Sequence, residues 1–451
     1  MSTATLDFIR NELSLPDGRK LAETLPTDPW LVDDVLKPIL ATDDDGGPLH
    51  KLIYIELARG HYKTGSVANV AIAVALEESG TDVIAVASDL DQAALVHEAI
   101  DGQRERNPRL AAALVRTKRM FKTRNGSTIK IMSSDAPSAL GIGVNCKRLR
   151  IICDELTQWP RADLYHAMAT TLPKVWDSQL IIITNAGVSP GSAWQWGVRQ
   201  AANEHGYMFT AEGTIASWIR PEDLEHVRAT VPPPIYARFH ENAWVEEAST
   251  FVPIELWDAC ADPALSPLRP LSEGERARDA EQVVIGVDAG VTGDCFAIVS
   301  VTRDPARPED AVAVRDVAIW MPRHGHAIDF SEPWAHLETM CQRHNVAVIA
   351  YDPYQLHDFM QRFQRDIGYW CSPFDQGAKR AQADSDLFQL IRSKRTRHNG
   401  DPGLREHIAN CGWKVAAQED TRARLIKRGS GKIDSAVALS MSASECLRLL
   451  L

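Results

Sequence analysis

The sequence lacks the features of a secreted, membrane-bound or zinc-binding protein. Its eight cysteines are scattered, with no C-x-x-C pair and no histidine at a spacing typical of zinc sites. Apolar runs such as Val70–Leu76 are too short to span a bilayer. The N-terminal stretch MSTATLDFIRNELSLPDGRK has neither the basic region nor the apolar core of a signal peptide. We therefore expect reduced, structural thiols in a cytoplasm and no membrane partner.

The chain also lacks an excess of positive charge, because its formal net charge is -11 over 451 residues. This balance argues against a surface coated with basic residues for nucleic acid, although it does not exclude a local basic groove. Acidic residues gathered at metal sites would lower the net charge in the same way. The length favours two domains, and a hydrophobic content of 45% is typical of a globular protein.

Apolar runs alternate with helical segments in the first half of the chain. Strands are expected at residues 51–57, 82–88, 127–134, 149–155 and 180–186, and helices at residues 66–80 and 91–100. This alternation predicts a mostly parallel α/β sheet with functional residues at the carboxyl ends of its strands.

A stretch rich in proline and charge separates this half from a second set of strands. VPPPIYARF and DPALSPLRPLSEGERARDAEQ have the composition of a connector. EQVVIGVDAG and GDCFAIVSVT then read as a hairpin, followed by VAVRDVAIW, VAVIAYD and YWCSPF. We therefore predict an N-terminal α/β domain at 1–250, a linker at 251–280 and a C-terminal α/β domain at 281–451.

The segment ARGHYKTG, residues 58–65, carries part of a phosphate-binding loop. Lys63 and Thr64 form the Lys-[ST] pair of G-x-x-x-x-G-K-[ST], but Leu57 and Tyr62 occupy the two glycine positions. The preceding strand and following helix give the context in which Lys63 would contact the β and γ phosphates and Thr64 would bind Mg²⁺. Taken alone, such a stretch is more often an ordinary strand, turn and helix, because Tyr62 lacks the freedom of glycine.

Two further strand ends support a nucleotide site. RLRIICDE ends in Asp154 and Glu155, which suit a Mg²⁺ ligand and a group that polarises an attacking water. A strand simply capped by acids is the alternative, but the pair together with the loop favours the nucleotide site. LIIITNAG ends in Thr184 and Asn185, which could sit beside the γ-phosphate; a plain strand end explains them equally well.

Three aspartates in the second half form a candidate metal site. Asp288 ends VVIGVD, Asp352 ends VAVIAYD, and Asp434 begins the amphipathic segment DSAVALSMSASECL. Singly, each is explained by a turn or a helix N-cap. Together, acids from separate elements can hold one or two divalent metals for phosphodiester cleavage. Asp294 is a possible fourth acid, although a turn residue explains it better.

Basic residues cluster near the last aspartate. They lie in RSKRTRH, residues 392–398, and in RARLIKRGSGK, residues 422–432. A solvated charged face and a phosphate-binding surface explain them equally well.

These segments together resemble the large terminase subunit of tailed bacteriophages over most of the chain. ARGHYKTG is similar to the family's deviant Walker A loop, IICDE to its Walker B strand and IITNAG to its coupling motif. DPWLVDDVLKPIL resembles the segment near the adenine, ASDLDQAALVHEAI the Gln-Ala helix, and ARFHENAWV the His-x-Asn-x-Trp signature. FDQGAKRAQADSDLFQLIRSKRTRHNGDPGLREHIANC and KIDSAVALSMSASE resemble the nuclease half.

The resemblance implies an N-terminal RecA-like ATPase of the additional-strand type and a C-terminal RNase H-like nuclease with a mixed sheet. Catalytic roles carry over to Glu155 in the ATPase and to Asp288, Asp352 and Asp434 in the nuclease. Thr64 and Asp154 would bind the metal at the ATP site, and the three nuclease acids would bind metals at the other. The implied ATP-binding residues are Arg59, Gly60, His61, Tyr62, Lys63, Thr64 and Asp154, and the implied coupling residues are Thr184 and Asn185. Two departures are Tyr62 in place of a glycine and Ser435 where some members carry a second acid.

The function implied by the resemblance is a DNA-packaging motor that uses ATP and Mg²⁺, with Mn²⁺ possible at the nuclease. Its partners would be double-stranded DNA, a portal protein and a small terminase subunit, with a pentameric ring during packaging. It would act in the host cytoplasm, transiently at the procapsid portal, and be absent from the mature virion. Candidates for an arginine finger are Arg59, Arg104, Arg106, Arg116 and Arg119. Two alternatives stay open: an ATP-dependent nuclease or helicase of DNA repair or recombination, and a nuclease whose ATPase domain, closed by Tyr62, is a structural clamp.

Overall fold

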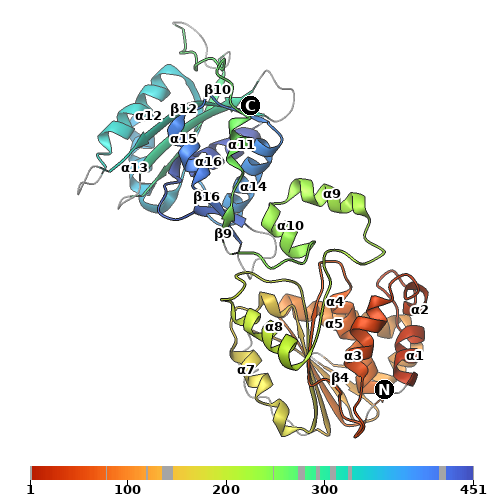
Figure 1. The fold of residues 1–451 in the computed structure, drawn as a ribbon. Helices are drawn as coiled ribbons and strands as arrows, with labels where there is room; N and C mark the ends of the chain where they lie inside the picture. Colours follow the sequence, from red (N-terminus) through yellow and green to blue (C-terminus); the bar gives the residue numbers. More distant parts are fainter. Residues whose placement is uncertain are drawn as a thin grey trace. The chain divides into compact units, whose positions relative to one another are not determined.

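The computed structural model describes residues 3–77, 79–117, 120–134, 146–246, 248–272, 280–290, 295–304, 311–322, 328–415 and 423–449. They divide into two units (Figure 1). Unit 1 consists of Met1–Ala229 and Ile235–Glu246, and unit 2 of Thr230–Pro234, Glu247–Ala416 and Thr421–Leu451, as far as these are described. No helix among the described residues is both long and apolar enough to cross a membrane.

Unit 1 is built on a sheet with the strand order β3-β4-β5-β2-β6-β7-β1-β8. Six neighbouring strands from β5 to β8 run parallel, and β3 and β4 add an antiparallel edge. The strands are β1 (Leu52–Glu56), β2 (Thr81–Ala87), β3 (Leu114–Arg116), β4 (Met120–Thr123), β5 (Thr128–Ser133), β6 (Arg148–Asp154), β7 (Asp177–Thr184) and β8 (Tyr207–Thr210). Because β7 lies between β1 and β6, the sheet has the inserted strand that defines the additional-strand ATPase fold.

Helices cover both faces of this sheet because its strands are apolar on both sides. Ile53 and Ile55 of β1 face one helical layer, whereas Tyr54 faces the other. The first layer contains α1 (Thr3–Glu12), α2 (Leu21–Thr24), η1 (Leu31–Leu36), α3 (Lys37–Leu40), α4 (Lys63–Glu77), α5 (Leu90–Arg106) and α6 (Pro108–Ala113). The second contains η3 (Leu156–Gln158), α7 (Asp163–Ala169), η4 (Leu172–Lys174) and α8 (Trp194–His205). After β8 the chain continues through α9 (Pro221–Thr230) and α10 (Pro233–Phe239).

Unit 2 contains a mixed sheet with the order β14-β13-β10-β11-β12-β15. β10, β11 and β12 form an antiparallel meander, and β13 and β14 add in parallel beside β10. The strands are β10 (Gln282–Ala289), β11 (Phe296–Arg303), β12 (Val312–Trp320), β13 (Asn345–Tyr351), β14 (Cys371–Pro373) and β15 (Thr396–Arg397). A meander extended by parallel strands beside its first strand is the RNase H-like arrangement that the resemblance implied.

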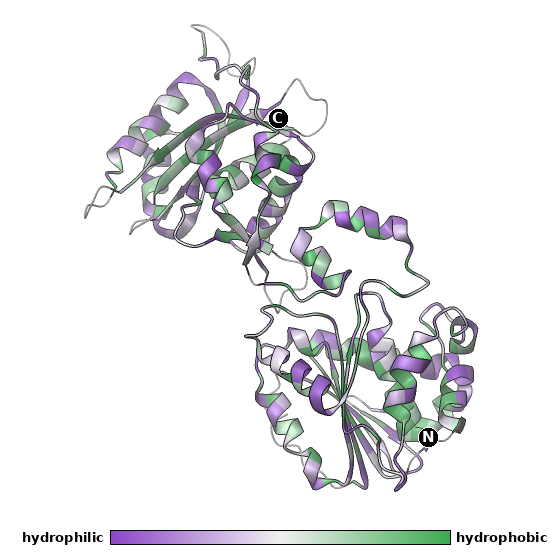
Figure 2. Cartoon of the chain, viewed as in Figure 1, coloured by the Kyte–Doolittle hydropathy of each residue, from purple (hydrophilic) through white to green (hydrophobic). Residues whose placement is uncertain are grey.

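Different helices cover the two faces of this sheet. Apolar residues of β10 at odd positions pack with α12 (Ser331–Arg343) and α13 (Pro353–Ile367). On the other face α16 (Asp434–Arg448) crosses β10 so closely that a Cβ on Gly286 would lie 2.0 Å from the Ala438 carbonyl oxygen. Next to α16 lies α14 (Ala378–Arg392), and the remaining helices are α11 (Ile254–Asp258) and α15 (Pro402–Ala409). The helices of both units carry hydrophilic as well as hydrophobic residues (Figure 2), as amphipathic helices do.

The predicted linker at 251–280 differs from the structure, which places residues 251–272 in unit 2. β9 (Ala248–Thr250) pairs with β16 (Cys411–Val415), which in turn pairs with β17 (Ala423–Lys427). The buried Trp257 stacks on His398 with a centroid distance of 4.0 Å. The proline-rich composition of this segment predicted a connector. That prediction missed the packing of the segment, because its strand and ring partners lie more than a hundred residues further along the chain. Residues 273–279 lie outside the described part.

Candidate nucleotide and nuclease sites

The loop of residues 58–65 connects β1 to α4 with the backbone geometry that the missing glycine would supply. Tyr62 has a φ of 55°, in the left-handed region that glycine adopts most easily. Its ring lies against Gly65, where a Cβ would come within 2.0 Å of Tyr62 Cε2. Tyr62 therefore adopts the required conformation, and Gly65 provides the space for its ring.

The Tyr62 hydroxyl ties this loop to the N-terminal segment. It donates a hydrogen bond to the Ser14 carbonyl oxygen at 2.8 Å and accepts one from Asn69 Nδ2 at 3.2 Å. Gln103 Nε2 donates to the same Ser14 carbonyl at 2.7 Å. Burial raises the pKa of Tyr62 to about 12, so the hydroxyl stays a proton donor at neutral pH. The ring is thus fixed at both ends, by Gly65 and by Ser14.

Replacing Gly65 by alanine is expected to distort the loop, because the ring of Tyr62 cannot move aside without losing its bond to Ser14. We expect a loss of about 1–3 kcal/mol in the free energy of unfolding, as for overpacking in a core, and weaker ATP binding. Calorimetric melting and nucleotide titration measure both effects. Tyr62→Gly/Gly65→Ala should recover part of the loss, because the double variant restores the space but lacks the hydrogen bonds of the Tyr62 hydroxyl.

A matched control is Gly197→Ala in α8, where an added Cβ meets nothing within 4 Å. Alanine is favoured over glycine inside a helix, so this variant should be neutral or slightly stabilising. Equal damage from both substitutions would contradict the role assigned to Gly65.

The end of β6 brings two carboxylates to the loop. Thr64 Oγ1 donates to Asp154 Oδ2 at 3.3 Å, and Lys63 Nζ lies 3.3 Å from Glu155 Oε1. Lys63 Nζ also donates to the carbonyl oxygens of Leu57 and Ala58. These four side chains, predicted from segments ninety residues apart, therefore lie together at the carboxyl end of the sheet.

The surroundings of Asp154 suit a divalent metal. Burial, and then the nearby Glu155 carboxylate, raise the pKa of Asp154 to about 7, although Lys63 and Thr64 lower it. Asp154 Oδ1 is buried and has no hydrogen-bond partner among the described residues. A cation would satisfy both the charge and this oxygen, so the residues fit Mg²⁺, with Thr64 and Asp154 as its protein contacts.

A pocket of about 520 Å³ opens beside the loop. Lys63, Thr64 and Glu155 line it, and α5, the predicted Gln-Ala helix, forms one wall. The complete lining is Pro16, Arg59, Gly60, Tyr62, Lys63, Thr64, Gly65, Ala68, Leu95, Glu98, Ala99, Gly102, Gln103, Arg106 and Glu155. The segment Asp28–Leu40, which resembled the family's adenine-proximal segment, supplies none of these residues, whereas Pro16 does.

The arginine-finger candidates differ in their surroundings. Arg59 and Arg106 line the pocket. Arg104 and Arg116 both form ion pairs with Asp101, whose carboxylate holds them together. Arg119 lies outside the described residues. Of the described candidates, Arg59 and Arg106 are therefore the ones placed at the pocket.

His61 is a buried, neutral histidine with a defined tautomer. Its Nε2 accepts a hydrogen bond from the Ile215 N–H at 2.9 Å, so Nδ1 carries the proton and donates to the Arg59 carbonyl oxygen at 3.2 Å. Burial lowers the pKa of His61 to about 4. The residue thus supports the loop through backbone contacts and does not line the pocket.

The stability of unit 1 should fall as the pH is lowered from about 6.5 to about 4. In this window the unfolded chain protonates His61, with an ordinary pKa of 6.5, while the folded chain does not. The neutral ring then contributes about 3 kcal/mol that is present above pH 6.5 and lost progressively below it. Denaturant unfolding at several pH values measures the slope. His61→Gln retains an acceptor but does not titrate, so its slope should be smaller than that of the wild type; equal slopes would contradict the assignment.

The predicted coupling residues contact the segment that follows Glu155. Thr157 N–H donates to Thr184 Oγ1 at 3.2 Å, and Thr157 Oγ1 donates to Asn185 Oδ1 at 2.8 Å. The Glu155 N–H donates to the Ile183 carbonyl oxygen at 2.9 Å. Thr184 and Asn185 thus contact Thr157, two residues after Glu155, and the Thr184 carbonyl oxygen accepts from the Leu57 N–H at 2.8 Å, just before the loop. Thr157 was missed because a threonine in a short turn has no distinctive sequence pattern.

Asn242, from the His-x-Asn-x-Trp signature, ties three strand ends together. Its Nδ2 donates to the carbonyl oxygens of Glu56 and Ala211, and its Oδ1 accepts from the Ala186 N–H at 3.0 Å. These residues follow or end β1, β8 and β7. The signature therefore fixes the backbone around the coupling residues.

In unit 2, Asp288 and Asp352 end neighbouring parallel strands. Val287 lies opposite Tyr351 in the β10–β13 register, and the Asp352 N–H donates to the Val287 carbonyl oxygen at 3.2 Å. Val287 and Tyr351 face α12 and α13, so the next residue of each strand faces the side of α16. The two carboxylates thus share one edge and one face of the sheet.

Asp352 also caps a helix, which is the structural role that would explain this aspartate without a metal. It is the N-cap of α13, and its Oδ1 accepts a hydrogen bond from the Tyr354 N–H at 2.8 Å. Burial raises the pKa of Asp352, whereas the Tyr354 N–H and the guanidinium groups of Arg380 and Arg424 lower it. Asp352 Oδ1 therefore caps α13, and the positive charges of Arg380 and Arg424 favour the ionised form of the carboxylate.

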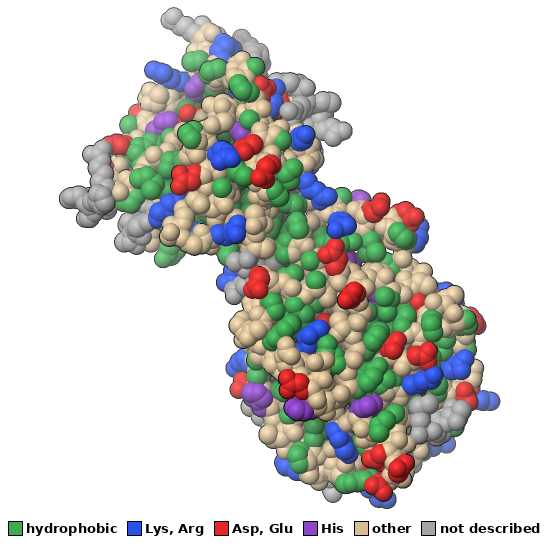
Figure 3. All heavy atoms as spheres, in the orientation of Figure 1, with side chains coloured by type: hydrophobic (Ala, Val, Ile, Leu, Met, Phe, Trp, Pro, Cys, Tyr) green, Lys and Arg blue, Asp and Glu red, His purple; other side chains and the backbone are tan. Residues whose placement is uncertain are grey.

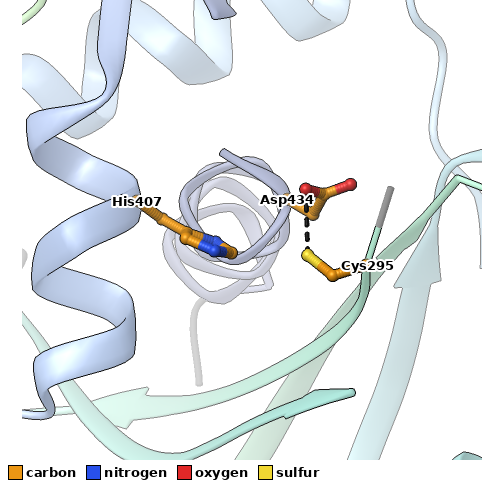
Figure 4. A group of neighbouring side chains, drawn as sticks. All are labelled: Cys295, His407 and Asp434. Atoms are coloured by element: carbon orange, nitrogen blue, oxygen red, sulfur yellow. Dashed lines mark hydrogen bonds between the residues drawn. The ribbon is translucent and has the colours of Figure 1, made fainter. Parts of the chain in front are cut away.

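Asp434 begins α16 without capping it, because Ile433 is the N-cap. The Cys295 thiol donates to Asp434 Oδ2 at 3.0 Å (Figure 4). His407 Nδ1 accepts from the Ser435 N–H at 3.0 Å. One potential ligand atom from each of Cys295, His407 and Asp434 lies within 4.8 Å of the others. Cys295 and His407 therefore fix the first turn of α16, and sequence reasoning missed both because they are distant in the chain.

Asp288, Asp352 and Asp434 thus come from three elements that meet around β10 and α16. Carboxylates are the ligand type that Mg²⁺ and Mn²⁺ prefer. Among the described residues, however, the three potential ligand atoms that lie within 4.8 Å of one another belong to Cys295, His407 and Asp434, and the three acids do not form such a group. Asp294 lies outside the described residues.

The two basic stretches have different surroundings. Arg397 forms ion pairs with Asp262 and Asp304, so the first stretch is partly structural. Arg424 of β17 acts on the Asp352 carboxylate, which places the second stretch near the acids; Arg422 at its start lies outside the described part. On the face drawn in Figure 3, basic and acidic side chains are interspersed over both units.

Comparison with known proteins gives the same family for unit 2. Residues 309–448 match the family model "Terminase large subunit, endonuclease domain". The chain resembles a terminase large subunit. A comparison of the chain with curated proteins found no match.

Solved large terminases share the fold of the whole chain. A large terminase from a thermophilic bacteriophage is 12% identical, with 95% of this chain and 98% of that chain covered and a TM-score of 0.54. The same protein in complex with ATP-gamma-S is 11% identical, with 93% of this chain and 98% of that chain covered and a TM-score of 0.51. The HK97 bacteriophage large terminase is 19% identical over 98% of both chains, with a TM-score of 0.45. At these identities the matches to the thermophilic phage protein establish the two-domain fold, and the roles of individual residues depend on the geometry above.

Proposed function

We propose that this terminase-like chain is a DNA-packaging motor subunit. It hydrolyses ATP in unit 1 to move double-stranded DNA into a procapsid, and it cuts concatemeric DNA with a metal-dependent endonuclease in unit 2. The observation that carries the first part is the meeting of Lys63, Thr64, Asp154 and Glu155 beside the pocket. The match of residues 309–448 to the terminase endonuclease domain carries the second.

At the ATP site, Lys63 would neutralise the β and γ phosphates while the N-terminus of α4 faces them. Thr64 and Asp154 would hold Mg²⁺, which would help to neutralise the charge of the phosphates. Glu155 would accept a proton from the attacking water, and Arg59 or Arg106, which line the pocket, would contact the phosphates. The contacts of Thr157 with Thr184 and Asn185 would carry the change at the site to the ends of β7 and β1.

At the nuclease site, Asp288, Asp352 and Asp434 would hold Mg²⁺ or Mn²⁺. The ion would activate water and stabilise the leaving oxygen in phosphodiester cleavage. We further propose that the chain assembles as a pentameric ring at the portal with a small terminase subunit. This would occur in the host cytoplasm, and the chain would not remain in the mature virion.

Two rivals are an ATP-dependent nuclease or helicase of repair or recombination and a clamp closed at Tyr62. Against the clamp, Tyr62 packs on Gly65 and leaves a pocket lined by Lys63 and Glu155. Titration of the full chain with Mg²⁺-ATP tests this directly: we expect saturable binding that Lys63→Ala weakens. Absence of binding would favour the clamp. Portal-dependent packaging of DNA into procapsids, or its failure, separates the motor from the repair enzyme.

A further inference from the structure

The second basic stretch of the sequence contributes to a small antiparallel sheet in unit 2, in which β16 lies between β9 and β17. Successive side chains of a strand point to opposite faces of a sheet. Trp413 and Leu425 lie opposite each other in the β16–β17 register, and both are buried. The ring centroid of Trp413 lies 5.0 Å from that of Phe251 and 5.7 Å from that of Phe388. One face of this sheet is therefore part of the core of unit 2.

The other face of the sheet carries exposed cations, and we call it the basic face. Lys414 lies directly opposite Arg424 in the β16–β17 register, and both side chains are exposed. Like charges at opposite positions of an antiparallel pair repel each other, so this pair weakens the hairpin unless an anion lies between them. The Arg424 guanidinium makes no ion pair or hydrogen bond with the described residues. Stabilisation of the fold therefore does not explain why these two cations face each other.

A glycine holds a third cation, Arg428, on the basic face. The stem of Arg428 crosses β16 above Gly412, where an added Cβ would lie 2.7 Å from Arg428 Cγ and 3.0 Å from Cδ. Arg428 Nη1 then donates a hydrogen bond to Thr250 Oγ1, next to β16 on β9, at 2.9 Å. Gly412 and Thr250 thus fix the Arg428 side chain across the sheet.

The chain leads from the basic face directly to Asp434, one of the candidate nuclease acids. The Arg428 N–H donates to the Asn410 carbonyl oxygen at 2.9 Å, and Asn410 Nδ2 donates to the Lys432 carbonyl oxygen at 3.2 Å. Because Asn410 directly precedes β16, it fixes this connection against the sheet. Asp434 follows Arg428 by six residues, which span at most about 20 Å. That distance is about six base pairs of duplex DNA.

We propose that the basic face binds the phosphate backbone of double-stranded DNA and holds it beside the candidate nuclease acids. Gly412, under Arg428, and Lys414 are two residues apart on β16, which is about 7 Å. This spacing is that of about two nucleotides along the axis of a duplex. Lysine and arginine neutralise phosphates without reading the bases, so the face would hold DNA of any sequence. The inference rests on the proposed function, because it takes DNA as the substrate of unit 2.

The test is binding of a short, fluorescently labelled DNA duplex to the full chain without metal or nucleotide, measured by anisotropy at several salt concentrations. Lys414→Gln/Arg424→Gln removes the two opposed cations. We expect its affinity to fall by about tenfold or more at about 0.1 M salt. The slope of log K against log salt should become shallower by about 1.8, because each phosphate contact contributes about 0.9. In plasmid cleavage, the DNA concentration that gives half the maximal rate should rise, whereas the maximal rate should change little.

Arg362→Gln/Arg365→Gln is the matched control. Both arginines are exposed on α13, which covers the face of the six-stranded sheet opposite to α16, and the net charge changes by the same amount. This control should bind the duplex as the wild type does. Lys414→Arg/Arg424→Lys keeps both charges and should also bind normally. Melting followed by circular dichroism should show that Lys414→Gln/Arg424→Gln is as stable as the wild type or slightly more stable, because the repulsion is removed.

Three results would overturn the inference while leaving the proposed nuclease in place, provided that the wild type cleaves plasmid DNA with Mg²⁺. One is equal duplex binding by Lys414→Gln/Arg424→Gln and the control. Another is weak binding by Lys414→Arg/Arg424→Lys. The third is tighter binding of polyglutamate than of duplex at equal charge, which would assign the basic face to an acidic protein.

The proposed function fails in a different way. A wild type that binds the duplex through Lys414 and Arg424 but cleaves no plasmid DNA would contradict the nuclease and retain the basic face. Absence of duplex binding by the wild type would contradict both.

Discussion

Glu155→Gln is expected to abolish ATP turnover while ATP still binds. Glu155 Oε1 lies 3.3 Å from Lys63 Nζ, and Oε2 is buried without a hydrogen-bond partner among the described residues. An ionised carboxylate in this position can take a proton from water, whereas the amide of similar shape cannot. Loss of such a base lowers a rate by about 100-fold to 10,000-fold.

Binding should survive this change because other groups hold the nucleotide. Lys63, Thr64 and Asp154 remain, and Lys63 loses a competing carboxylate partner. The unusual backbone at residue 155, with φ 51°, is anchored through its N–H to Ile183 and does not depend on the side chain. Steady-state ATP hydrolysis and titration with Mg²⁺-ATP therefore report separate properties of one variant.

Glu204→Gln, an exposed change near the end of α8, is the matched control and should leave turnover unchanged. Normal turnover in Glu155→Gln would remove Glu155 from the mechanism. Loss of ATP binding in that variant would show instead that the carboxylate has a structural role in the loop.

The sequence predicted those features of the fold and of the nucleotide site that depend on neighbouring residues. The apolar strands followed by Lys63-Thr64 and by Asp154-Glu155 predicted which strand ends would form the nucleotide site, and these residues do lie together. The two-domain α/β fold is confirmed. Strand periodicity and polar residues at strand ends depend on neighbouring residues only, so a single sequence contains them.

The behaviour of Tyr62 could not be predicted from the motif. The loop consensus requires a conformation, not a glycine, and Tyr62 adopts it because Gly65 lacks a side chain and Ser14 offers an acceptor. The first partner lies three residues away and the second forty-eight. Comparison with a consensus therefore identified the departure but not its compensation.

Long-range contacts account for the rest of what was missed. Cys295 and His407 hold the start of α16, and Asp384 of α14 accepts hydrogen bonds from Leu425 of β17 and Ser440 of α16. The segment after residue 250 looked like a linker because β16 and His398, its partners, are distant in sequence. Each of these contacts depends on tertiary packing, which leaves no periodic or spacing signal.

Asp352→Asn is expected to stop metal-dependent DNA cleavage without changing ATP hydrolysis. Asparagine keeps an oxygen that can accept the Tyr354 N–H, so the N-cap of α13 and the fold of unit 2 should persist. The change removes one negative charge from the acids that would hold the ion. We expect plasmid cleavage with Mg²⁺ or Mn²⁺ to fall by at least about 100-fold, as when a metal-bound nucleophile is lost.

Asp401→Asn is a closely matched control for this variant. Asp401, like Asp352, precedes a proline and caps a helix, and its Oδ1 accepts from the Leu404 N–H at 2.8 Å. It caps α15 and is not one of the three acids assigned to the metal, so Asp401→Asn should cleave DNA normally. Because all residues assigned to ATP belong to unit 1, both variants should hydrolyse ATP at the wild-type rate. Wild-type cleavage by Asp352→Asn would exclude Asp352 as a ligand, and equal loss in both variants would point to a folding defect instead.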